Sequence, residues 1–247
     1  MNKKDISIAT ITWARNEQEE ALLRRALEQL AKMEIPVFIS DGGSGAAFLD
    51  FLKSFSNFFL SDPGTRGVWP QAKNSLSEAY ITGSKFIFYT EPDKLDFFAT
   101  SLPLMLNNMS VDEQTGVVIA SRSTKGFATF PPFQQMTETT INNCCAEITG
   151  KTFDYTYGPF LLNRELVPYL GELPQHIGWG WRPFAFCLAH RLGYKVENFA
   201  DDFYCPPDQQ QDNSKERIYR MSQLSQNMEG IVLSGSVNLE NKNALNK

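Results

Sequence analysis

The sequence predicts an α/β fold, a single domain in which helices flank a mostly parallel central sheet. Over residues 6–90, short segments rich in β-branched and aromatic residues alternate with longer segments of helical periodicity. Such alternation is typical of parallel βαβ units. No internal repeat or linker divides the 247 residues, and 42% of them are hydrophobic, which is enough to bury one sizeable core.

The first half of the chain gives the clearest elements. Strands are expected where apolar residues run together before a polar turn, at residues 6–11, 36–40 and 86–89. Helices are expected after the first two of these strands and before the third, at residues 17–30, 48–55 and 72–83. The turn-rich stretch FFLSDPGTRGVWPQ, residues 58–71, is expected to form a loop.

The second half is less regular. Two further strands are expected, at residues 117–120 and 158–162, and three helices, at residues 137–149, 183–192 and 214–229. A segment rich in Phe and Pro, residues 127–133, is expected to be a loop. From residue 234 onward the sequence is polar and rich in Asn, so residues 234–247 are expected to form a frayed C-terminal tail.

Composition and charge argue against several classes of protein. The formal net charge is -5, the pI is about 5.2, and Lys and Arg are scattered along the chain, which argues against nucleic-acid binding. No apolar run approaches the roughly 20 residues of a membrane-spanning helix, and no signal segment precedes the first strand. The four cysteines show no CxxC spacing. Reduced thiols and a cytoplasmic location are therefore expected.

An acidic pair, Glu91-Pro92-Asp93, directly follows the apolar strand KFIFYT. Two carboxylates at positions i and i+2, separated by a proline of fixed φ, can meet one hard divalent cation. A cation held in this way can bridge a diphosphate and neutralise the charge that develops on a leaving group. The alternative is structural, because DKLDFF begins a helical pattern and Asp93 could cap that helix.

Two other polar turns follow predicted strands. Residues 14–17, ARNE, come after the first strand, and residues 41–44, DGGS, come after the second. Asp41 can accept a hydrogen bond from a nucleobase, while the glycines allow the backbone to approach a ligand. Ordinary βα turns are the alternative, with Asn16 as a helix N-cap. In a parallel sheet these turns share one edge with the acidic pair, the edge where open α/β sheets bind ligands.

Taken in order, these segments resemble the GT-A glycosyltransferases, chiefly the family 2-like group. The shared features are a first strand ending in ARNE, a second ending in SDGGS, a helix opening with AKN, and a strand ending in an acid-x-acid pair. The resemblance covers about residues 6–200 and is clearest over the first hundred. It implies a single Rossmann-like GT-A domain over residues 1–233, with a nucleotide-binding half at about 1–100 and an acceptor half at about 101–233.

The resemblance also implies roles for individual residues. The first turn would lie near the nucleoside and comprises Ala14, Arg15, Asn16 and Glu17. Asp41 would contact the base, and Lys73 of AKN would reach the base or a phosphate. Glu91 would contact the ribose and join Asp93 in holding Mg²⁺ or Mn²⁺ on the diphosphate, although the family usually has Asp in place of Glu91. Arg122, after another predicted strand, is a candidate phosphate contact.

The later part of the chain departs from the family pattern. Many members have an acidic pair there that supplies the base of inverting enzymes, whereas this chain reads GWGWRP at residues 178–183. Two explanations remain open. The reaction is a retaining one that needs no such base, or another acid takes the role, such as Glu138, Asp201 or Asp202.

The segment that replaces the acidic pair has candidate functional residues of its own. Trp179 and Trp181 stand between glycines and could stack on a sugar, with core packing as the alternative. Arg182 could hold a carboxylate or a phosphate with its planar guanidinium. Some retaining relatives use a late histidine as a metal ligand, which makes His176 a candidate for that role, with a structural role as the alternative.

We therefore expect a glycosyltransferase that moves a sugar from a nucleotide-diphosphate sugar to an unidentified acceptor, with Mg²⁺ or Mn²⁺ as cofactor. One alternative is a catalytically silent domain of the same fold that binds a nucleotide or a sugar. A second alternative is a sugar-phosphate nucleotidyltransferase. That class needs a Gly-rich N-terminal phosphate loop, and residues 12–16, TWARN, supply none.

Overall fold

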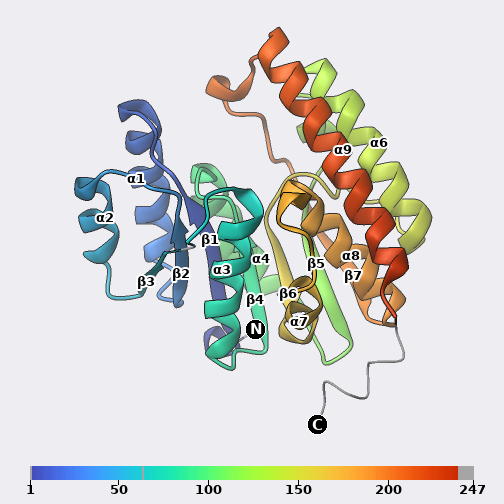
Figure 1. The fold of residues 1–247 in the computed structure, drawn as a ribbon, viewed down its shortest axis with the longest axis horizontal. Helices are drawn as coiled ribbons and strands as arrows, with labels where there is room; N and C mark the ends of the chain where they lie inside the picture. Colours follow the sequence, from blue (N-terminus) through green and yellow to red (C-terminus); the bar gives the residue numbers. More distant parts are fainter. Residues whose placement is uncertain (1, 63, 239–247) are drawn as a thin grey trace.

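A seven-stranded sheet forms the centre of the molecule, in the order β3-β2-β1-β4-β6-β5-β7 (Figure 1). The computed structural model describes residues 2–62 and 64–238. The strands are β1 (Ile6–Thr12), β2 (Val37–Asp41), β3 (Phe58–Ser61), β4 (Phe86–Thr90), β5 (Thr115–Arg122), β6 (Phe160–Asn163) and β7 (Lys195–Asp201). Strand β6 pairs antiparallel with both β4 and β5, and the other strands run parallel. The mostly parallel sheet is confirmed.

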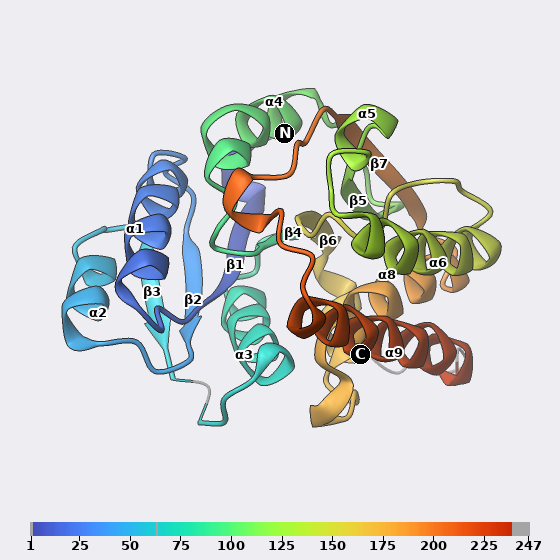
Figure 2. The same ribbon diagram turned by 90° about the horizontal axis from the view of Figure 1, so that it is seen from above.

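Helices cover both faces of this sheet. They are α1 (Glu17–Ala31), α2 (Ala46–Lys53), α3 (Val68–Ile81), α4 (Leu102–Asn108), α5 (Thr124–Phe127), α6 (Pro132–Thr149), α7 (Val167–Leu170), α8 (Trp181–Arg191) and α9 (Ser214–Ser236). Seen from above, α3 and α4 lie on opposite sides of the sheet (Figure 2). Helices α6 and α9 lie side by side next to α8 and form an outer layer over that end of the sheet.

Alternation along the buried strands divides the interior into two cores. Ala9 and Ile87 face the core that contains α3, α6 and α8. Their neighbours Ile8 and Phe88 face the core that contains α1, α2 and α4. Because successive side chains of a strand point to opposite faces, a strand covered on both faces is apolar throughout. This is why the central strands are recognisable as continuous apolar runs in the sequence.

Several predicted boundaries were wrong. Strands β3 and β7 were not predicted, and both lie at the ends of the sheet, where a strand is covered less completely. The supposed loop at residues 58–71 contains β3 and the first turn of α3, and α6 begins at Pro132 inside the supposed Phe/Pro loop. Pro70 and Pro132 both occupy first turns of helices, where a missing backbone N–H costs nothing.

The C-terminal region also differs from the prediction. Helix α9 continues to Ser236, and Ser234 is buried, so the expected tail does not begin at residue 234. The remainder of that prediction, residues 239–247, lies outside the described residues. Within the described part of the chain, no helix has the length and apolar character needed to cross a bilayer.

Candidate active site

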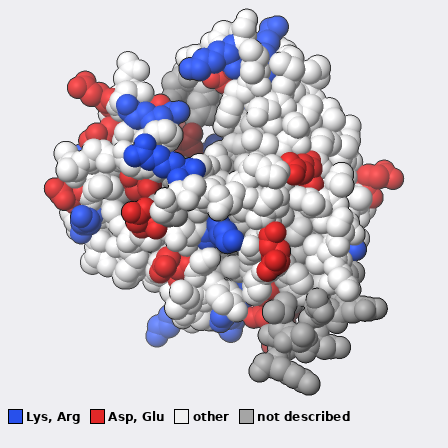
Figure 3. All heavy atoms as spheres, in the orientation of Figure 1, with Lys and Arg blue, Asp and Glu red and all other residues white. Residues whose placement is uncertain are grey.

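A cleft of about 680 Å³ opens at the edge of the sheet where the parallel strands end. Strands β1, β2, β4 and β5 all run toward this edge, so the turns that follow them meet there. The cleft lies between these turns and the α6–α9 layer. Figure 3 shows the molecule hollowed near the top of this face, with basic side chains on either side. Its volume falls within the roughly 300–1,000 Å³ typical of ligand sites.

The carboxylates of Glu91 and Asp93 form the floor of the cleft. Glu91 Oε1 accepts a hydrogen bond from Arg182 Nη1 at 2.6 Å, and Asp93 Oδ2 accepts one from Gln209 Nε2 at 3.0 Å. The other two oxygens, Glu91 Oε2 and Asp93 Oδ1, are buried and have no hydrogen-bond partner among the described residues. Lys94 Nζ lies 3.9 Å from Asp93 Oδ1, which is too far for a hydrogen bond but close enough for charge attraction.

Glycine at position 158 makes room for the Glu91 carboxylate. Gly158 has a φ of 131°, which favours glycine, and a Cβ at this position would collide with Glu91 Oε2. It precedes β6, whose antiparallel direction brings its start to the ligand-binding edge. The backbone at Gly158 can therefore approach the Glu91 carboxylate closely.

Arg182 stands in the first turn of α8 and reaches into the cleft. Its guanidinium lies over the Trp179 ring, 4.6 Å from the ring centroid, and holds Glu91 through Nη1. Its Nε is buried and has no hydrogen-bond partner within the described chain. The structure thus brings Arg182 together with the acidic pair, and three buried polar atoms here, on Arg182, Glu91 and Asp93, have no hydrogen-bond partner in the described part of the chain.

The acidic pair suits a divalent cation only in combination with a ligand. Among residues 2–62 and 64–238, no three His, Cys, Asp or Glu side chains converge in a way that could hold a metal. Mg²⁺ commonly uses one or two carboxylates and takes further oxygens from substrate phosphates. The two unpaired oxygens of Glu91 and Asp93 fit that pattern. They are the residues that could hold Mg²⁺ or Mn²⁺ beside a diphosphate.

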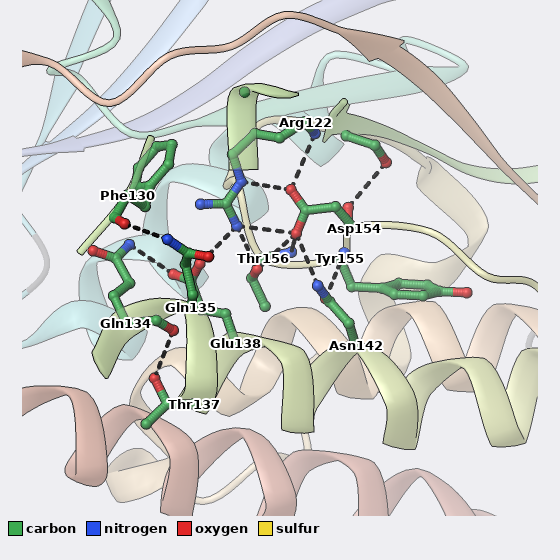
Figure 4. A network of polar contacts seen from close by, with 12 residues as sticks. Arg122, Phe130, Gln134, Gln135, Thr137, Glu138, Asn142, Asp154, Tyr155 and Thr156 are labelled. Atoms are coloured by element: carbon green, nitrogen blue, oxygen red, sulfur yellow. Dashed lines mark hydrogen bonds and ion pairs between the residues drawn. The ribbon is translucent and has the colours of Figure 1, made fainter. Parts of the chain in front are cut away.

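A second buried arginine, Arg122, lines the same cleft at the end of β5 (Figure 4). Its Nε donates to Asp154 Oδ2 at 2.6 Å, and its Nη2 donates to Asp154 Oδ1, Glu138 Oε2 and Thr156 Oγ1 at 3.0, 2.7 and 2.7 Å. The Phe127 and Phe130 rings lie within 4.6 Å of the guanidinium carbon, measured to the ring centroids. Arg122 was predicted to contact a phosphate, but its Nε and Nη2 donors are used inside the protein.

The charges in this cluster stabilise each other. Burial alone would lower the pKa of Arg122, but the charges of Glu138 and Asp154 outweigh it and raise that pKa above its ordinary value. Burial likewise raises the pKa of Asp154, and the Arg122 charge and hydrogen bonds more than offset this, so its pKa is lowered. Arg122 and Asp154 are therefore ionised at neutral pH.

Glu138 lines the cleft, but both of its oxygens are engaged. Oε2 accepts from Arg122, and Oε1 accepts from Gln134 Nε2 at 2.8 Å. It would have to give up a hydrogen bond before acting as a general base, the role considered for it from the sequence. Asp201 and Asp202, the other acids considered, do not line the cleft.

The prediction that Trp181 stacks on a sugar was wrong, and the core-packing alternative holds. Its side chain is 0% exposed and packs against Trp69, Tyr89 and Phe160, with ring centroids 4.6 to 5.6 Å apart. As the first residue of α8, it points into the core between the sheet and α3, so it cannot stack on a substrate. The other glycine-flanked tryptophan, Trp179, does line the cleft.

In the first turn, one of the four predicted nucleoside contacts reaches the cleft. Arg15 lines it and is held by Glu19, to which its Nε and Nη2 donate at 2.9 and 2.8 Å. Asn16 caps α1, accepting from Glu19 N, and Glu17 begins that helix. The backbone N–H of Ala14 donates to Ser44 Oγ. Ala14, Asn16 and Glu17 therefore support the turn and do not line the cleft.

Asp41 has the role of a turn-stabilising carboxylate. Its Oδ1 accepts from the backbone N–H groups of Gly43 and Ser44, at 2.8 and 2.7 Å. Its Oδ2 accepts from the hydroxyls of Thr12 and Ser44, at 2.8 and 2.7 Å. With four such bonds its oxygens are committed to joining the turns after β1 and β2, and the predicted contact with a base would need one of these bonds to open.

Lys73 and His176 do not lie with the other candidates. Lys73 Nζ donates to the carbonyl of Gly171 at 2.7 Å, outside the cleft lining. His176 lies in the turn before α8, and its Nε2 is 3.0 Å from Glu229 Oε1 of α9. Neither side chain lines the cleft. The structure therefore does not bring Lys73 to a nucleotide or His176 to Asp93.

One wall of the cleft was missed by the sequence reasoning. It is a polar stripe on α9, made of Glu216, Tyr219, Arg220, Gln223 and Asn227. Their spacing of three or four residues is helical, so the stripe is visible in the sequence. The apolar residues of this helix do not mark its buried face, since Ile218 and Met221 are 64% and 50% exposed.

No protein-family model matches this sequence, and no curated protein matches it. Solved structures do match. Glucosyl-3-phosphoglycerate synthase from Mycobacterium tuberculosis, in complex with UDP, superposes with a TM-score of 0.63 and 14% identity, covering 94% of this chain and 81% of that chain. The same enzyme with Mn²⁺, UDP-glucose and phosphoglyceric acid superposes with a TM-score of 0.61 and 13% identity, covering 91% of this chain and 79% of that chain. Its complex with Mg²⁺ and UDP superposes with a TM-score of 0.61 and 13% identity, covering 94% of this chain and 80% of that chain.

The chain has the GT-A fold. The superposition covers nearly the whole chain, including the part beyond residue 101 where the sequence resemblance is weaker. In this GT-A domain the acidic pair after β4, the arginine at the start of α8 and the polar stripe of α9 all line one cleft. UDP, UDP-glucose, phosphoglyceric acid, Mn²⁺ and Mg²⁺ are ligands of the mycobacterial synthase in those structures.

Proposed function

We propose that this chain is a glycosyltransferase that moves a sugar from a nucleotide-diphosphate sugar to an acceptor with the help of Mg²⁺ or Mn²⁺. The observation that carries the proposal is that one buried carboxylate oxygen of Glu91 and one of Asp93 have no hydrogen-bond partner among the described residues, and both residues line the cleft. Buried polar atoms without partners are costly, so their presence together in a cleft points to a ligand that completes them.

In this proposal Asp93 and Glu91 hold the cation against the diphosphate, and Asp93 is the principal ligand. When bound, the cation neutralises the negative charge that develops on the departing nucleoside diphosphate. Arg182 keeps the Glu91 carboxylate oriented and adds positive charge beside the leaving group. Lys94, above the Tyr157 ring, adds a second cation next to Asp93. Catalysis then consists mainly of positioning and charge stabilisation.

UDP is the first nucleotide to test, because the structures of similar fold contain UDP with Mn²⁺ or Mg²⁺. The nucleoside end of the donor is placed between Arg15 and the start of α3, where Trp13 and Gly67 line the cleft. Trp13 is 42% exposed and offers an aromatic face for a base. This places the sugar and the bond to be broken near the acidic pair.

A nucleotide-binding domain without catalysis is the second candidate. The observation that favours it is the 2.6 Å ion pair of Arg182 with Glu91, which occupies one of the two acids, in a chain that lacks the family's acidic pair at residues 178–183. Such a domain would bind the nucleotide but leave a nucleotide sugar intact. Hydrolysis of the donor therefore separates the two candidates.

A thermal-shift panel tests the proposal. Wild-type protein is heated with UDP, GDP, CDP or dTDP, each with and without Mn²⁺. We expect one nucleotide to raise Tm and Mn²⁺ to increase that rise, because ligands that bind the folded state stabilise it. The corresponding nucleotide sugars are then assayed for release of nucleoside diphosphate. The proposal is wrong if no nucleotide stabilises the protein, and the non-catalytic alternative holds if binding occurs without release.

A further inference from the structure

Carboxamide side chains line the cleft wall formed by α6, α9 and the loop that precedes α9. Each uses one end in a hydrogen bond inside the protein, and its other end has no partner among the described residues. They are Gln134, Gln209, Gln211, Gln223 and Asn227. The unpaired ends are of both kinds. The Nε2 groups of Gln211 and Gln223 are donors, whereas the oxygens of Gln134, Gln209 and Asn227 are acceptors.

The charges on this wall do not favour an anion. Arg122 is held by Glu138 and by Asp154 behind it, so that cluster carries a net negative charge. On α9, Arg220 lines the cleft, and its Nη1 donates to Gln223 Oε1 at 3.0 Å. Glu216, one turn away on α9, also lines the cleft and offsets its charge. Arg182, which lies over the Trp179 ring, is paired with Glu91, so a phosphate or carboxylate bound here would meet acceptor oxygens and acidic groups with little uncompensated positive charge.

Aromatic side chains complete the wall. Trp179 Nε1 donates to Tyr219 Oη at 3.0 Å, which fixes the two rings relative to each other beside the amides. Tyr219 is 45% exposed. An aromatic surface that is accessible next to mixed donors and acceptors suits a molecule with an apolar face and a rim of hydroxyls. A sugar ring has that character.

We propose that the acceptor held by α6 and α9 is a neutral, hydroxyl-rich molecule, a saccharide, rather than a phosphorylated or carboxylated acid. A hydroxyl both donates and accepts, so it can pair with each kind of unpaired amide end on this wall. A phosphate or a carboxylate accepts only. The inference deepens the proposed function and rests on it, because it assigns the acceptor side of the same cleft.

The acceptor wall meets the nucleoside end of the cleft at Trp179 and Tyr219, which share a hollow with Gly67, and extends from there along α6 and α9. Helix α1 and the α6–α9 pair lie on opposite sides of the sheet's centre, and the acidic pair after β4 lies between them (Figure 1). Gln209 lies between the donor and acceptor parts of the cleft, since its Nε2 donates to Asp93 while its Oε1 has no hydrogen-bond partner among the described residues. A saccharide on this wall would therefore sit next to the carboxylates that mark the reacting end of the donor.

Saturation-transfer NMR on wild-type protein with UDP and Mg²⁺ tests the inference. Matched pairs of small molecules are compared: glucose with glucose 6-phosphate, and glycerol with glycerate and 3-phosphoglycerate; maltose is added as a larger saccharide. We expect stronger transfer to glucose and maltose than to any acid. Gln223→Leu should lower the saccharide signal at least threefold, whereas Gln210→Leu, an exposed neighbour of Gln211 outside the cleft, should leave it unchanged.

Each possible result of this experiment either supports or overturns the inference that the acceptor is a saccharide. Stronger transfer to a phosphorylated or carboxylated member of a pair overturns the inference, as does a lack of transfer to both glucose and maltose. A saccharide signal that Gln223→Leu leaves intact also overturns it, because the sugar then occupies another part of the cleft. The UDP resonances in the same sample report donor binding separately. If they show no transfer, the proposed function fails, independently of the acceptor result.

Discussion

Two buried arginine–carboxylate clusters line the same cleft, and they differ in how completely their polar atoms are paired. Arg122 makes four side-chain hydrogen bonds, three of them to Asp154 and Glu138, and its partners are bonded in turn by Gln134 and Asn142. The Arg182 cluster has a single hydrogen bond between arginine and acid. Arg182 Nε, Glu91 Oε2 and Asp93 Oδ1 are buried there without partners in the described chain.

The difference distinguishes a structural network from a binding site. A cluster whose buried charges are neutralised by hydrogen-bonded partners stabilises the fold, and opening it leaves those charges uncompensated. A cluster with unpaired buried atoms gives up about 1–3 kcal/mol for each such atom. That cost is recovered when a ligand supplies the missing partners. The Arg122 cluster therefore joins the end of β5 to α6 and stabilises the fold. The Arg182 cluster is the part of the cleft that we expect to bind a ligand.

The largest expected effect is on stability, and it compares the two arginines directly. Arg122→Gln leaves Asp154 and Glu138 buried without their cation, and we expect a loss of about 3–5 kcal/mol in the free energy of unfolding. Arg182→Gln removes one charged hydrogen bond, and we expect a loss of about 1–2 kcal/mol. Urea unfolding of both variants measures this difference. Equal losses would contradict the distinction between the two clusters.

In an assay of donor turnover the two variants should rank the other way, with Arg182→Gln impaired more than Arg122→Gln. Arg182→Gln is expected to slow donor turnover by about 100-fold, the effect typical of removing one preorganised donor at developing negative charge. Arg182→Lys, which keeps the charge but not the planar guanidinium, should recover part of the loss. Donor turnover unchanged by Arg182→Gln would remove Arg182 from the site.

A smaller effect is expected from the glycine that makes room for Glu91. Gly158→Ala places a methyl group against Glu91 Oε2 and demands a φ that alanine rarely adopts. We expect a loss of stability of about 1–3 kcal/mol together with weaker nucleotide binding, because the carboxylate must move. Gly150→Ala is a suitable control, since Gly150 also has positive φ but has open space around its Cβ position. Nucleotide binding weakened equally by both variants would mean that the space beside Glu91 is unimportant.

The Arg122 cluster also predicts how the stability of the protein falls at acid pH. Asp154 has a pKa below its ordinary value, so the unfolded chain binds its proton more readily than the folded chain does. Its contribution is complete above the unfolded pKa of about 3.9 and is lost as pH falls through the lower folded value. Asp154→Asn should therefore be less stable than wild type at pH 7 and lose less stability below about pH 4. The expectation would be contradicted if the free energy of unfolding, measured with denaturant, fell equally below pH 4 in wild type and Asp154→Asn.

The smallest expected effect concerns a residue that the sequence resemblance placed at the nucleotide. Lys73→Ala should leave nucleotide affinity within about twofold of wild type, because Lys73 Nζ is bonded to the Gly171 carbonyl outside the cleft. Arg15→Ala, the basic residue that does line the nucleoside end, should weaken binding several-fold more. Titration of UDP into both variants measures the difference. Equal losses of UDP affinity in the two variants would mean that Lys73 does contact the nucleotide.

Local patterns in the sequence predicted the fold because the central strands are buried on both faces and are separated by helices with clear apolar stripes. The end strands β3 and β7 escaped because partial exposure weakens that pattern. Likewise, the acidic pair was found because Glu91 and Asp93 stand directly after a strand whose direction is fixed by the βαβ pattern. These features depend on neighbours close in the chain.

The features that were missed depend on distant partners. Arg122 meets Asp154, 32 residues later, so the sequence did not show that its charge is neutralised. Trp181 stands between a glycine and Arg182 in a segment that looks exposed, yet it fills the core against Trp69. On α9, the stripe with Gln223 faces the cleft while apolar Ile218 faces solvent. Which face of a helix lines a site is decided by the packing of α6 and α8 against it.

The most direct test of the central claim is calorimetric titration of UDP into wild type, Asp93→Ala and Asp96→Asn, each with and without Mn²⁺. Asp96 is an exposed acid close to Asp93 in the chain and lies outside the cleft lining, which makes it the matched control. We expect Mn²⁺ to tighten UDP binding about 10-fold or more, equivalent to about 1.4 kcal/mol, in wild type and Asp96→Asn, and not in Asp93→Ala. An equal gain in all three proteins, or no binding of UDP to wild type with Mn²⁺ present, would contradict the assignment of Asp93 as the metal-binding residue of a UDP-sugar site.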